Sequence, residues 1–199
     1  NFSEFFTSLS NLAYQYFPIL DKSENEEENY LAEAPGILNV NATFYNLDTL
    51  TQFFVPQLSI PDNVSLNANL DANNDIYSLN ITAPDIELDT VILVNTKFNL
   101  NSDRDGLNVD IFSDKINFKG NEVFNNLEIS TMSQSDSIQL NLTWDNQNDS
   151  IRYAGDFSAS VLFESSLNDN IALVSQLYNS EFILNNQNWT LDDARVRID

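Results

Sequence analysis

The chain has 199 residues, which is enough for one large β domain or two small ones. Its 30 acidic and 8 basic residues give a formal net charge of −22. This charge argues against binding to nucleic acid or to anionic membrane surfaces, because both need clustered Lys and Arg. The chain has no Cys and no His, which argues against zinc, haem and iron–sulfur sites and excludes Ser-His and Cys-His catalysis. No cofactor and no metal site is expected.

The first twenty residues have the spacing of an amphipathic helix. Apolar residues recur every three or four positions: Phe2, Phe5, Phe6, Leu9, Leu12, Ala13, Tyr16, Phe17 and Leu20. Pro18 predicts that the helix ends at or before Phe17. Such a helix packs on the sheet, or it caps an apolar groove.

An acidic linker follows the predicted helix. The run Glu24–Asn29 is polar and mostly acidic, and Pro35 and Gly36 come after it. The sequence therefore predicts two units: an amphipathic helix plus linker over 1–35, and a β-rich domain over 36–199. Within the second unit, Asn46 can cap a short helix near 46–55, which Pro56 ends.

Alternating apolar and polar residues dominate the rest of the chain, and they predict strands with one apolar face and one polar face. The expected strands are 37–45, 64–71, 75–83, 85–94, 96–101, 107–113, 115–119, 123–131, 136–144, 151–163, 171–177, 180–185 and 193–199. Short turns rich in Asn and Asp separate them, and no long helical pattern intervenes. We therefore predict an all-β fold with mostly antiparallel neighbours.

The alternation also predicts which side chains share the apolar face of the sheet. The candidate lining residues are Leu66, Leu70, Leu79, Ile81, Leu107, Val109, Ile111, Ile138, Leu140, Leu142 and Trp144. The residues between them are expected to face solvent: Asn67, Asn69, Asn80, Asn108, Asn141 and Thr143. A register slip of one residue would exchange the two sets.

Few residues suggest catalysis. Asp103-Arg104-Asp105-Gly106 lacks the further oxygen ligands of a calcium loop and predicts a hairpin turn. Two carboxylates could converge as in glycosidases, but no particular pair stands out. Trp144 and Trp189 are either core anchors or stacking platforms for sugar rings. No catalytic residue is predicted, and we expect that the chain is not an enzyme.

The stretch from Leu38 to Asp199 resembles the TamB family (translocation and assembly module) of the AsmA-like superfamily, in its Bacteroidetes form. The motifs that carry the resemblance are, in order, Asn46-Leu47-Asp48-Thr49-Leu50, Phe53-Phe54-Val55-Pro56, Ser65–Asp71, Ser78–Pro84, Leu140–Trp144, Tyr153–Phe157, Asn188–Leu191 and Val196–Asp199. The chain starts at Asn1 without an initiating Met, a signal peptide or a transmembrane run. We therefore expect an internal fragment of a longer protein.

The resemblance implies a curved amphipathic sheet that forms an open, taco-like trough with an apolar inside. It also implies a periplasmic location, an inner-membrane anchor, and an Omp85-type outer-membrane partner, with the anchor and the partner-binding region lying outside this segment. The implied function is shielding of phospholipid acyl chains or unfolded outer-membrane proteins during outer-membrane biogenesis. The residues agree independently, because a sheet with one apolar side must cover it with another sheet, helices, lipid or a client chain.

Two alternatives remain open at the level of sequence. A surface carbohydrate-binding or adhesive β-sandwich would pack two apolar faces together, and a glycosidase-like enzyme would place two carboxylates in a polar cleft. The terminal strand 194–199 is expected to be a sheet edge, and unpaired edges recruit other strands. We therefore expect self-association through exposed edges.

Overall fold

The computed structural model describes residues 16–20, 37–48, 51, 53, 55–60, 63–71, 74, 76–102, 106–147, 150–165 and 171–198. Strands account for 77% of these residues, which confirms the all-β class. Most of the predicted helix over 2–20 and the linker over 21–35 lie outside the described residues. The part that is described includes a short 3-10 turn, η1 (Pro18–Leu20).

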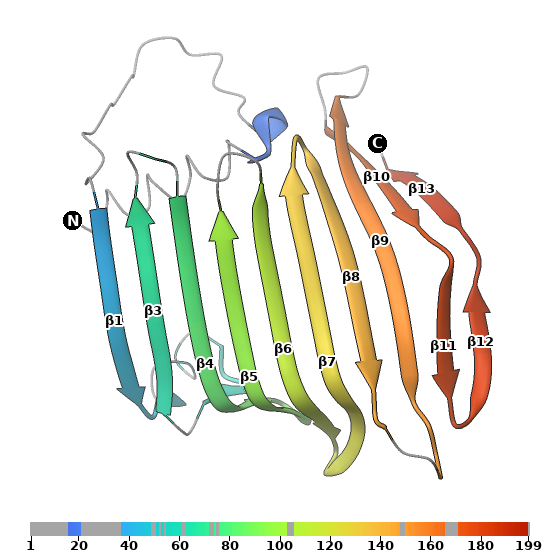
Figure 1. The fold of residues 1–199 in the computed structure, drawn as a ribbon, viewed down its shortest axis with the longest axis horizontal. Helices are drawn as coiled ribbons and strands as arrows, with labels where there is room; N and C mark the ends of the chain where they lie inside the picture. The colour runs from blue at the N-terminus through green and yellow to red at the C-terminus, as the bar shows by residue number, and fades with distance from the viewer. Residues whose placement is uncertain are drawn as a thin grey trace.

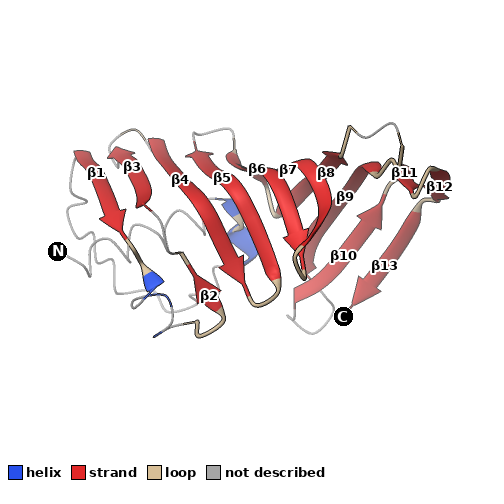
Figure 2. Ribbon diagram, turned by 90° about the horizontal axis from the view of Figure 1, so that it is seen from below, coloured by secondary structure: helices blue, strands red, loops and turns tan. Residues whose placement is uncertain are grey.

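The strands are β1 (Ile37–Tyr45), β2 (Leu58–Ser59), β3 (Asn63–Asp71), β4 (Ile76–Leu88), β5 (Val91–Ser102), β6 (Leu107–Phe118), β7 (Asn121–Gln134), β8 (Ser137–Asp145), β9 (Ala154–Ser165), β10 (Ile171–Leu177), β11 (Ser180–Leu184), β12 (Gln187–Leu191) and β13 (Ala194–Ile198). They form one sheet in the order β1-β3-β4-β5-β6-β7-β8-β9-β10-β13, and every pair is antiparallel (Figure 1). Figure 2 shows these strands as a single twisted layer. Among the described residues no second sheet packs on it.

At the C-terminal end of the sheet, the two outermost strands are each interrupted. β10 and β11 pair with successive parts of β9, while β13 pairs with β10 and β12 pairs with β11. Ser180, the first residue of β11, makes hydrogen bonds at the break between β10 and β11. Its hydroxyl donates a hydrogen bond to the carbonyl of Tyr178 (2.8 Å) and accepts one from the backbone N–H of Ser158 (3.3 Å). The C-terminal end of the sheet is therefore one long hairpin with a break in each arm.

Four neighbouring strands bend at the same level. On β4 to β7 the residues Pro84, Asn95, Asp114 and Asn126 interrupt the ladders, and the same register resumes beyond them. Between β5 and β6 the gap also includes Thr96 and Ser113. Figure 1 shows the bend near the lower ends of these strands. We call these four residues the kink row.

The kink row corrects the predicted strand boundaries. The breaks expected between 75–83 and 85–94, between 85–94 and 96–101, and between 107–113 and 115–119 do not separate strands. The predicted strands leave out positions 84, 95 and 114, but in the structure these residues bend continuous strands. The actual turn between β4 and β5 lies at Asp89–Thr90. The short strand β2 and the strand β12 were also missed.

Side-chain hydrogen bonds stabilise the bend. Asn95 and Asn126 have positive φ angles of 51° and 50°, a conformation that Asn tolerates better than other non-Gly residues. The Asn95 amide donates to Oδ2 of Asp114 (2.7 Å). The fully buried Ser113 hydroxyl lies within hydrogen-bond distance of the Val94 and Lys115 carbonyls (2.9 and 3.0 Å) and can donate to either.

The segment that ends in η1 packs across one end of the sheet. Tyr16 is only 2% exposed and packs against Tyr77 on β4. The ring of Phe17 contacts that of Phe163 on β9 edge-to-face, with 5.5 Å between centroids. The backbone N–H of Asp136, in the β7–β8 turn, donates to the carbonyl of Tyr16 (3.0 Å). These contacts tie β4, the β7–β8 turn and β9 together.

The segment before β2 contains helix-like hydrogen bonds. Asn46 accepts a hydrogen bond from the N–H of Asp48 (2.9 Å), as expected of a cap. The backbone N–H groups of Thr51 and Val55 donate to the carbonyls four residues earlier, on Leu47 and Thr51 (2.8 and 2.7 Å). Residues 49, 50, 52 and 54 of the predicted helix lie outside the described part.

The kink row generates a stability prediction. Asn95→Val should lower the free energy of unfolding by about 1–2 kcal/mol, because a β-branched residue is strained at positive φ. Asn95→Gly keeps the conformation but loses the hydrogen bond to Asp114, so its loss should be smaller. Denaturant unfolding followed by circular dichroism measures both. Equal losses would mean that the hydrogen bond, and not the φ angle, makes Asn95 important.

Candidate apolar binding face

Cross-strand register brings apolar side chains together in rows that run across the sheet. Directly opposite residues in neighbouring strands point to the same face. The longest uninterrupted apolar row is Ala42–Leu66–Ile81–Phe98–Ile111–Ile129–Leu142–Phe157. It joins eight strands, from β1 to β9.

Two further rows lie on the same face, because their residues are two and four positions away along each strand. The first is Val40–Ala68–Leu79–Leu100–Val109–Thr131–Leu140–Ala159–Leu177–Ala194. The second is Leu38–Leu70–Tyr77–Ser102–Leu107–Ser133–Ile138–Val161–Ser175–Val196. We call the surface made by these three rows and the Trp144 side chain the apolar face.

The structure brings all the predicted lining residues onto this face. These residues are Leu66, Leu70, Leu79, Ile81, Leu107, Val109, Ile111, Ile138, Leu140, Leu142 and Trp144, and each is partly buried. Large apolar members of the face that the prediction does not include are, for example, Phe98, Leu100, Ile129 and Phe157. The same alternation marks them in the sequence, for example in Lys97-Phe98-Asn99-Leu100. Their role in binding stays a prediction.

The opposite face carries polar rows. One of them is Asn41–Asn67–Asn80–Asn99–Asp110–Ser130–Asn141–Ser158. Of the residues predicted to face solvent, Asn67, Asn69, Asn80 and Asn141 are exposed, whereas Asn108 and Thr143 are partly buried on this polar face. The predicted register is therefore correct, since a one-residue slip would place these residues on the apolar face.

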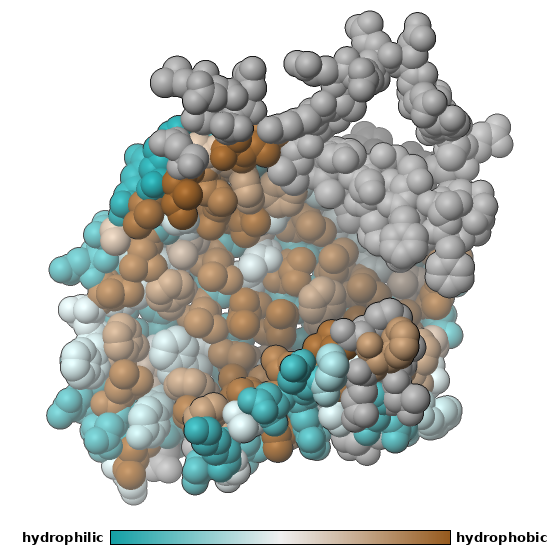
Figure 3. Space-filling view, turned by 180° about the vertical axis from the view of Figure 1, so that it is seen from behind, coloured by the Kyte–Doolittle hydropathy of each residue, from teal (hydrophilic) through white to brown (hydrophobic). Residues whose placement is uncertain are grey.

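The apolar face stays partly accessible to solvent. None of its predicted lining residues is fully buried. Figure 3 shows apolar side chains gathered across the middle of the face, with polar side chains toward its margins. The Tyr16 and Phe17 side chains pack on one end of it. The described residues thus form a broad apolar surface, covered at one end.

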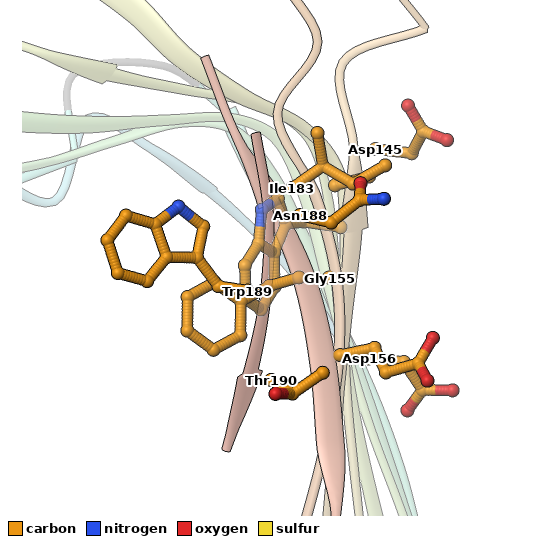
Figure 4. A pocket seen from close by; sticks show the side chains of 11 residues that line it. Asp145, Gly155, Asp156, Ile183, Asn188, Trp189 and Thr190 are labelled. Atoms are coloured by element: carbon orange, nitrogen blue, oxygen red, sulfur yellow. The ribbon is translucent and has the colours of Figure 1, made fainter. Parts of the chain in front are cut away.

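A pocket of about 530 Å³ lies where β8, β9, β11 and β12 meet (Figure 4). Its lining residues are Trp144, Asp145, Ala154, Gly155, Asp156, Glu181, Phe182, Ile183, Asn188, Trp189 and Thr190. Trp144, Gly155, Phe182 and Trp189 are cross-strand neighbours. The pocket is therefore walled by aromatic side chains that continue the apolar face toward the C-terminal edge.

Gly155 makes room for the Trp144 ring. A Cβ atom at position 155 would lie 2.3 Å from two carbons of that ring. The ring also contacts Phe124 edge-to-face, with 5.4 Å between centroids. The indole N–H is buried and has no hydrogen-bond partner in the described part of the chain, although such a group usually finds one. Packing alone therefore holds the ring over Gly155.

The acidic residues around the pocket do not face its aromatic wall. In Figure 4 the carboxylates of Asp145 and Asp156 lie on the opposite side of the ribbon from Trp189. The side chain of Arg152 donates a hydrogen bond to Asp145 (2.8 Å) and, with the N–H of Gln147, lowers the pKa of that carboxyl below its usual value. The pocket therefore offers apolar contact more than acid–base chemistry.

No group of three or more acidic residues among those described is arranged to hold a metal ion. The loop at 103–105 lies outside the described residues. None of the described helical segments is both long and apolar enough to span a membrane.

The first prediction for the site concerns Gly155. Gly155→Ala should destabilise the fold by about 1–3 kcal/mol, because the new methyl group collides with the Trp144 ring. In a Trp144→Leu background the same substitution should have little effect, so the two changes should be strongly non-additive in denaturant unfolding. Gly106→Ala is a milder comparison, because its Cβ would lie 3.3 Å from Met132 Cε and 3.3 Å from the Ser133 carbonyl oxygen, so its loss should be smaller and should not depend on Trp144. Simple additivity would contradict the packing described here.

A second prediction concerns the ion pair between Asp145 and Arg152. Arg152→Gln should raise the pKa of Asp145 toward its ordinary value of 3.8, as followed by NMR titration of the carboxyl carbon. Because the folded-state pKa is depressed, this interaction stabilises the protein above the unfolded-state pKa and is lost as pH falls through the folded-state pKa. The pair is solvent-exposed, so the loss at neutral pH should be under about 1 kcal/mol. Arg195→Gln, the control, should leave the Asp145 titration unchanged.

Comparisons with models of protein families, with curated proteins and with solved structures found no match to this chain. The resemblance to the TamB family stays a prediction. What the chain binds must be inferred from the apolar face itself.

Proposed function

We propose that this chain binds phospholipid acyl chains, or apolar segments of unfolded outer-membrane proteins, on its apolar face. In this proposal it is a non-catalytic periplasmic segment of an envelope-spanning conduit of the TamB type. The observation that carries the proposal is the uninterrupted apolar row from Ala42 to Phe157, on a sheet face that no second sheet covers within the described residues. A large exposed apolar patch usually marks an interaction site.

The dimensions of the face suit an acyl chain. From β3 to β9 the rows cross six inter-strand spacings of about 4.8 Å, or about 29 Å in all. One leaflet of a bilayer contributes about half of a hydrocarbon core of about 30 Å. An acyl chain taken from a single leaflet can therefore lie along one row.

The chemistry of the face also suits an acyl chain. Each methylene removed from water contributes about 0.8 kcal/mol, so a chain of about fourteen carbons binds without directional contacts. The aromatic pocket at Trp144 and Trp189 adds a deeper hollow at the end of the rows. The net charge of −22 should disfavour anionic headgroups, so zwitterionic phospholipids are the favoured ligands.

One observation favours a second candidate, a carbohydrate-binding module. Trp189 is 50% exposed, and an exposed indole can stack on a sugar ring. A sandwich needs two packed sheets, however, and the described strands form only one. The carboxylates of Asp145 and Asp156 also lie away from the indole in Figure 4. We therefore favour an apolar ligand at this pocket.

Native mass spectrometry and lipid extraction of the purified chain test the proposal directly. We expect co-purified phospholipid, and saturable binding of an environment-sensitive fluorescent fatty acid that phospholipid displaces. Displacement by an unfolded outer-membrane protein but not by phospholipid would identify protein as the cargo. A chain that binds neither, but retains an oligosaccharide on an affinity gel, would support the carbohydrate alternative.

A matched pair of substitutions gives the sharpest prediction. Leu140→Asp places a carboxylate in the middle of the apolar face and should weaken fatty-acid binding at least about tenfold, because the charge must be desolvated. Asn141→Asp adds the same charge at the next residue, which is exposed on the polar face, and should change binding little. Circular dichroism should first show that both variants fold. Equal effects on binding would remove the apolar face as the site.

A further inference from the structure

The β1 strand has an edge without a partner in the described part of the chain. It pairs with β3 in continuous register along all nine of its residues, and β1 ends the strand order. Its two end residues are strongly exposed, Ile37 by 64% and Tyr45 by 76%. A row of backbone N–H and C=O groups therefore faces outward along a long, apolar strand.

This edge lacks the features that normally prevent strands from adding to a sheet. Natural edge strands are kept single by charged side chains, Pro, bulges or short length. The sequence Ile37–Tyr45 has no charged residue and no Pro, and its register with β3 contains no bulge. The opposite edge differs, because β13 carries Arg195 and Arg197 and a break at Asp192–Asp193 separates it from β12.

The pattern of β1 is also palindromic about its central residue, Asn41. Read in either direction, it runs apolar, apolar, polar, apolar, Asn, apolar, polar, apolar, apolar. If two copies of the strand pair antiparallel with Asn41 opposite Asn41, each apolar residue meets an apolar one. The pairs are Ile37 with Tyr45, Leu38 with Phe44, Asn39 with Thr43, and Val40 with Ala42.

We propose that two copies of this chain associate through β1, antiparallel and about a two-fold axis at Asn41. Such an interface uses the same strand from both copies and closes on itself. Pairing of β1 with β13 would instead leave one edge of each kind free and would continue into a filament. The two-fold pairing also places an uncharged strand at the contact of two molecules that each carry −22.

The dimer places the two apolar faces side by side. In β1, Leu38, Val40 and Ala42 belong to the three rows of the apolar face. The pairing sets Val40 of one copy opposite Ala42 of the other, and Leu38 opposite Phe44, so the apolar face continues into the second copy with its rows shifted along the strand. The dimer does not depend on the acyl-chain proposal, because backbone pairing needs no ligand. If acyl chains do bind, the dimer doubles the length of the apolar face across the strands.

Sedimentation across a concentration and salt series tests the interface. The wild-type chain should dimerise, more tightly at higher salt, which screens the net repulsion. Asn41→Lys should raise the dimer dissociation constant at least about tenfold, because it sets two like charges directly opposite at the axis. Asn80→Lys is the matched control, since Asn80 lies in the same polar row but on the interior strand β4, and it should dimerise like the wild type.

Single cysteines identify the edge independently of affinity, because the chain has no Cys of its own. Asn41→Cys brings two thiols together at the axis, where opposite Cβ atoms lie about 5 Å apart, and a short thiol-to-thiol crosslinker should join them quickly. Arg195→Cys on the β13 edge should crosslink slowly. Rapid crosslinking at position 195 but not at 41 would place the contact at the other edge and overturn the proposal.

Two further outcomes would also overturn the proposed dimer. One is a wild-type chain that stays monomeric at high concentration and salt, and the other is an equal increase in the dimer dissociation constant for Asn41→Lys and Asn80→Lys. The Asn41→Lys protein also separates this proposal from the proposed function. Position 41 lies on the polar face, so its monomer should still bind the fluorescent fatty acid. Loss of the dimer with retained binding would show that the two properties are independent.

Discussion

The strict two-residue alternation of side chains along each strand is the constraint on which the rest of this structure depends. An antiparallel meander keeps directly opposite residues on one face, so alternation within strands becomes rows across strands. A slip of one residue in the ladders of β8 would move Asn141 to the apolar face and Leu140 to the polar face. The three rows of the apolar face run without such a slip from β1 to β9, and the register shift between Ile116 and Asn117 in the β6–β7 ladder lies outside these rows.

The sequence predicts the structure most accurately where only this alternation matters. The strands 37–45 and 171–177 match β1 and β10 in both bounds, and the predicted lining residues share one face. Alternation is a local property of each strand and can be read without knowing the partner. Apolar members of the face that the prediction does not include, such as Phe98, follow the same rule.

The incorrect strand boundaries have a common physical cause. Pro84, Asn95 and Asp114 resemble turn residues, and the sequence cannot tell whether an irregular residue reverses the chain or only bends it. The distinction depends on the neighbouring strands, since all three residues fall at the same level of adjacent strands.

The pocket also depends on contacts between strands that the sequence does not show. It needs Trp144, Gly155, Phe182 and Trp189 to meet from four strands, and nothing in the sequence indicates which glycine accepts a tryptophan ring.

The meander has a further consequence for how such a protein folds and grows. Apart from the short β2, each strand pairs with strands next to it in the chain, or one hairpin away at the C-terminal end. Contacts are therefore short in sequence, which favours fast folding. Stability approximates a sum over adjacent hairpins, as in solenoid proteins, so folding can begin at more than one hairpin and spread outward. Duplication of a hairpin would lengthen the sheet while leaving distant strands undisturbed. A sheet of this kind can therefore change its width in evolution one hairpin at a time.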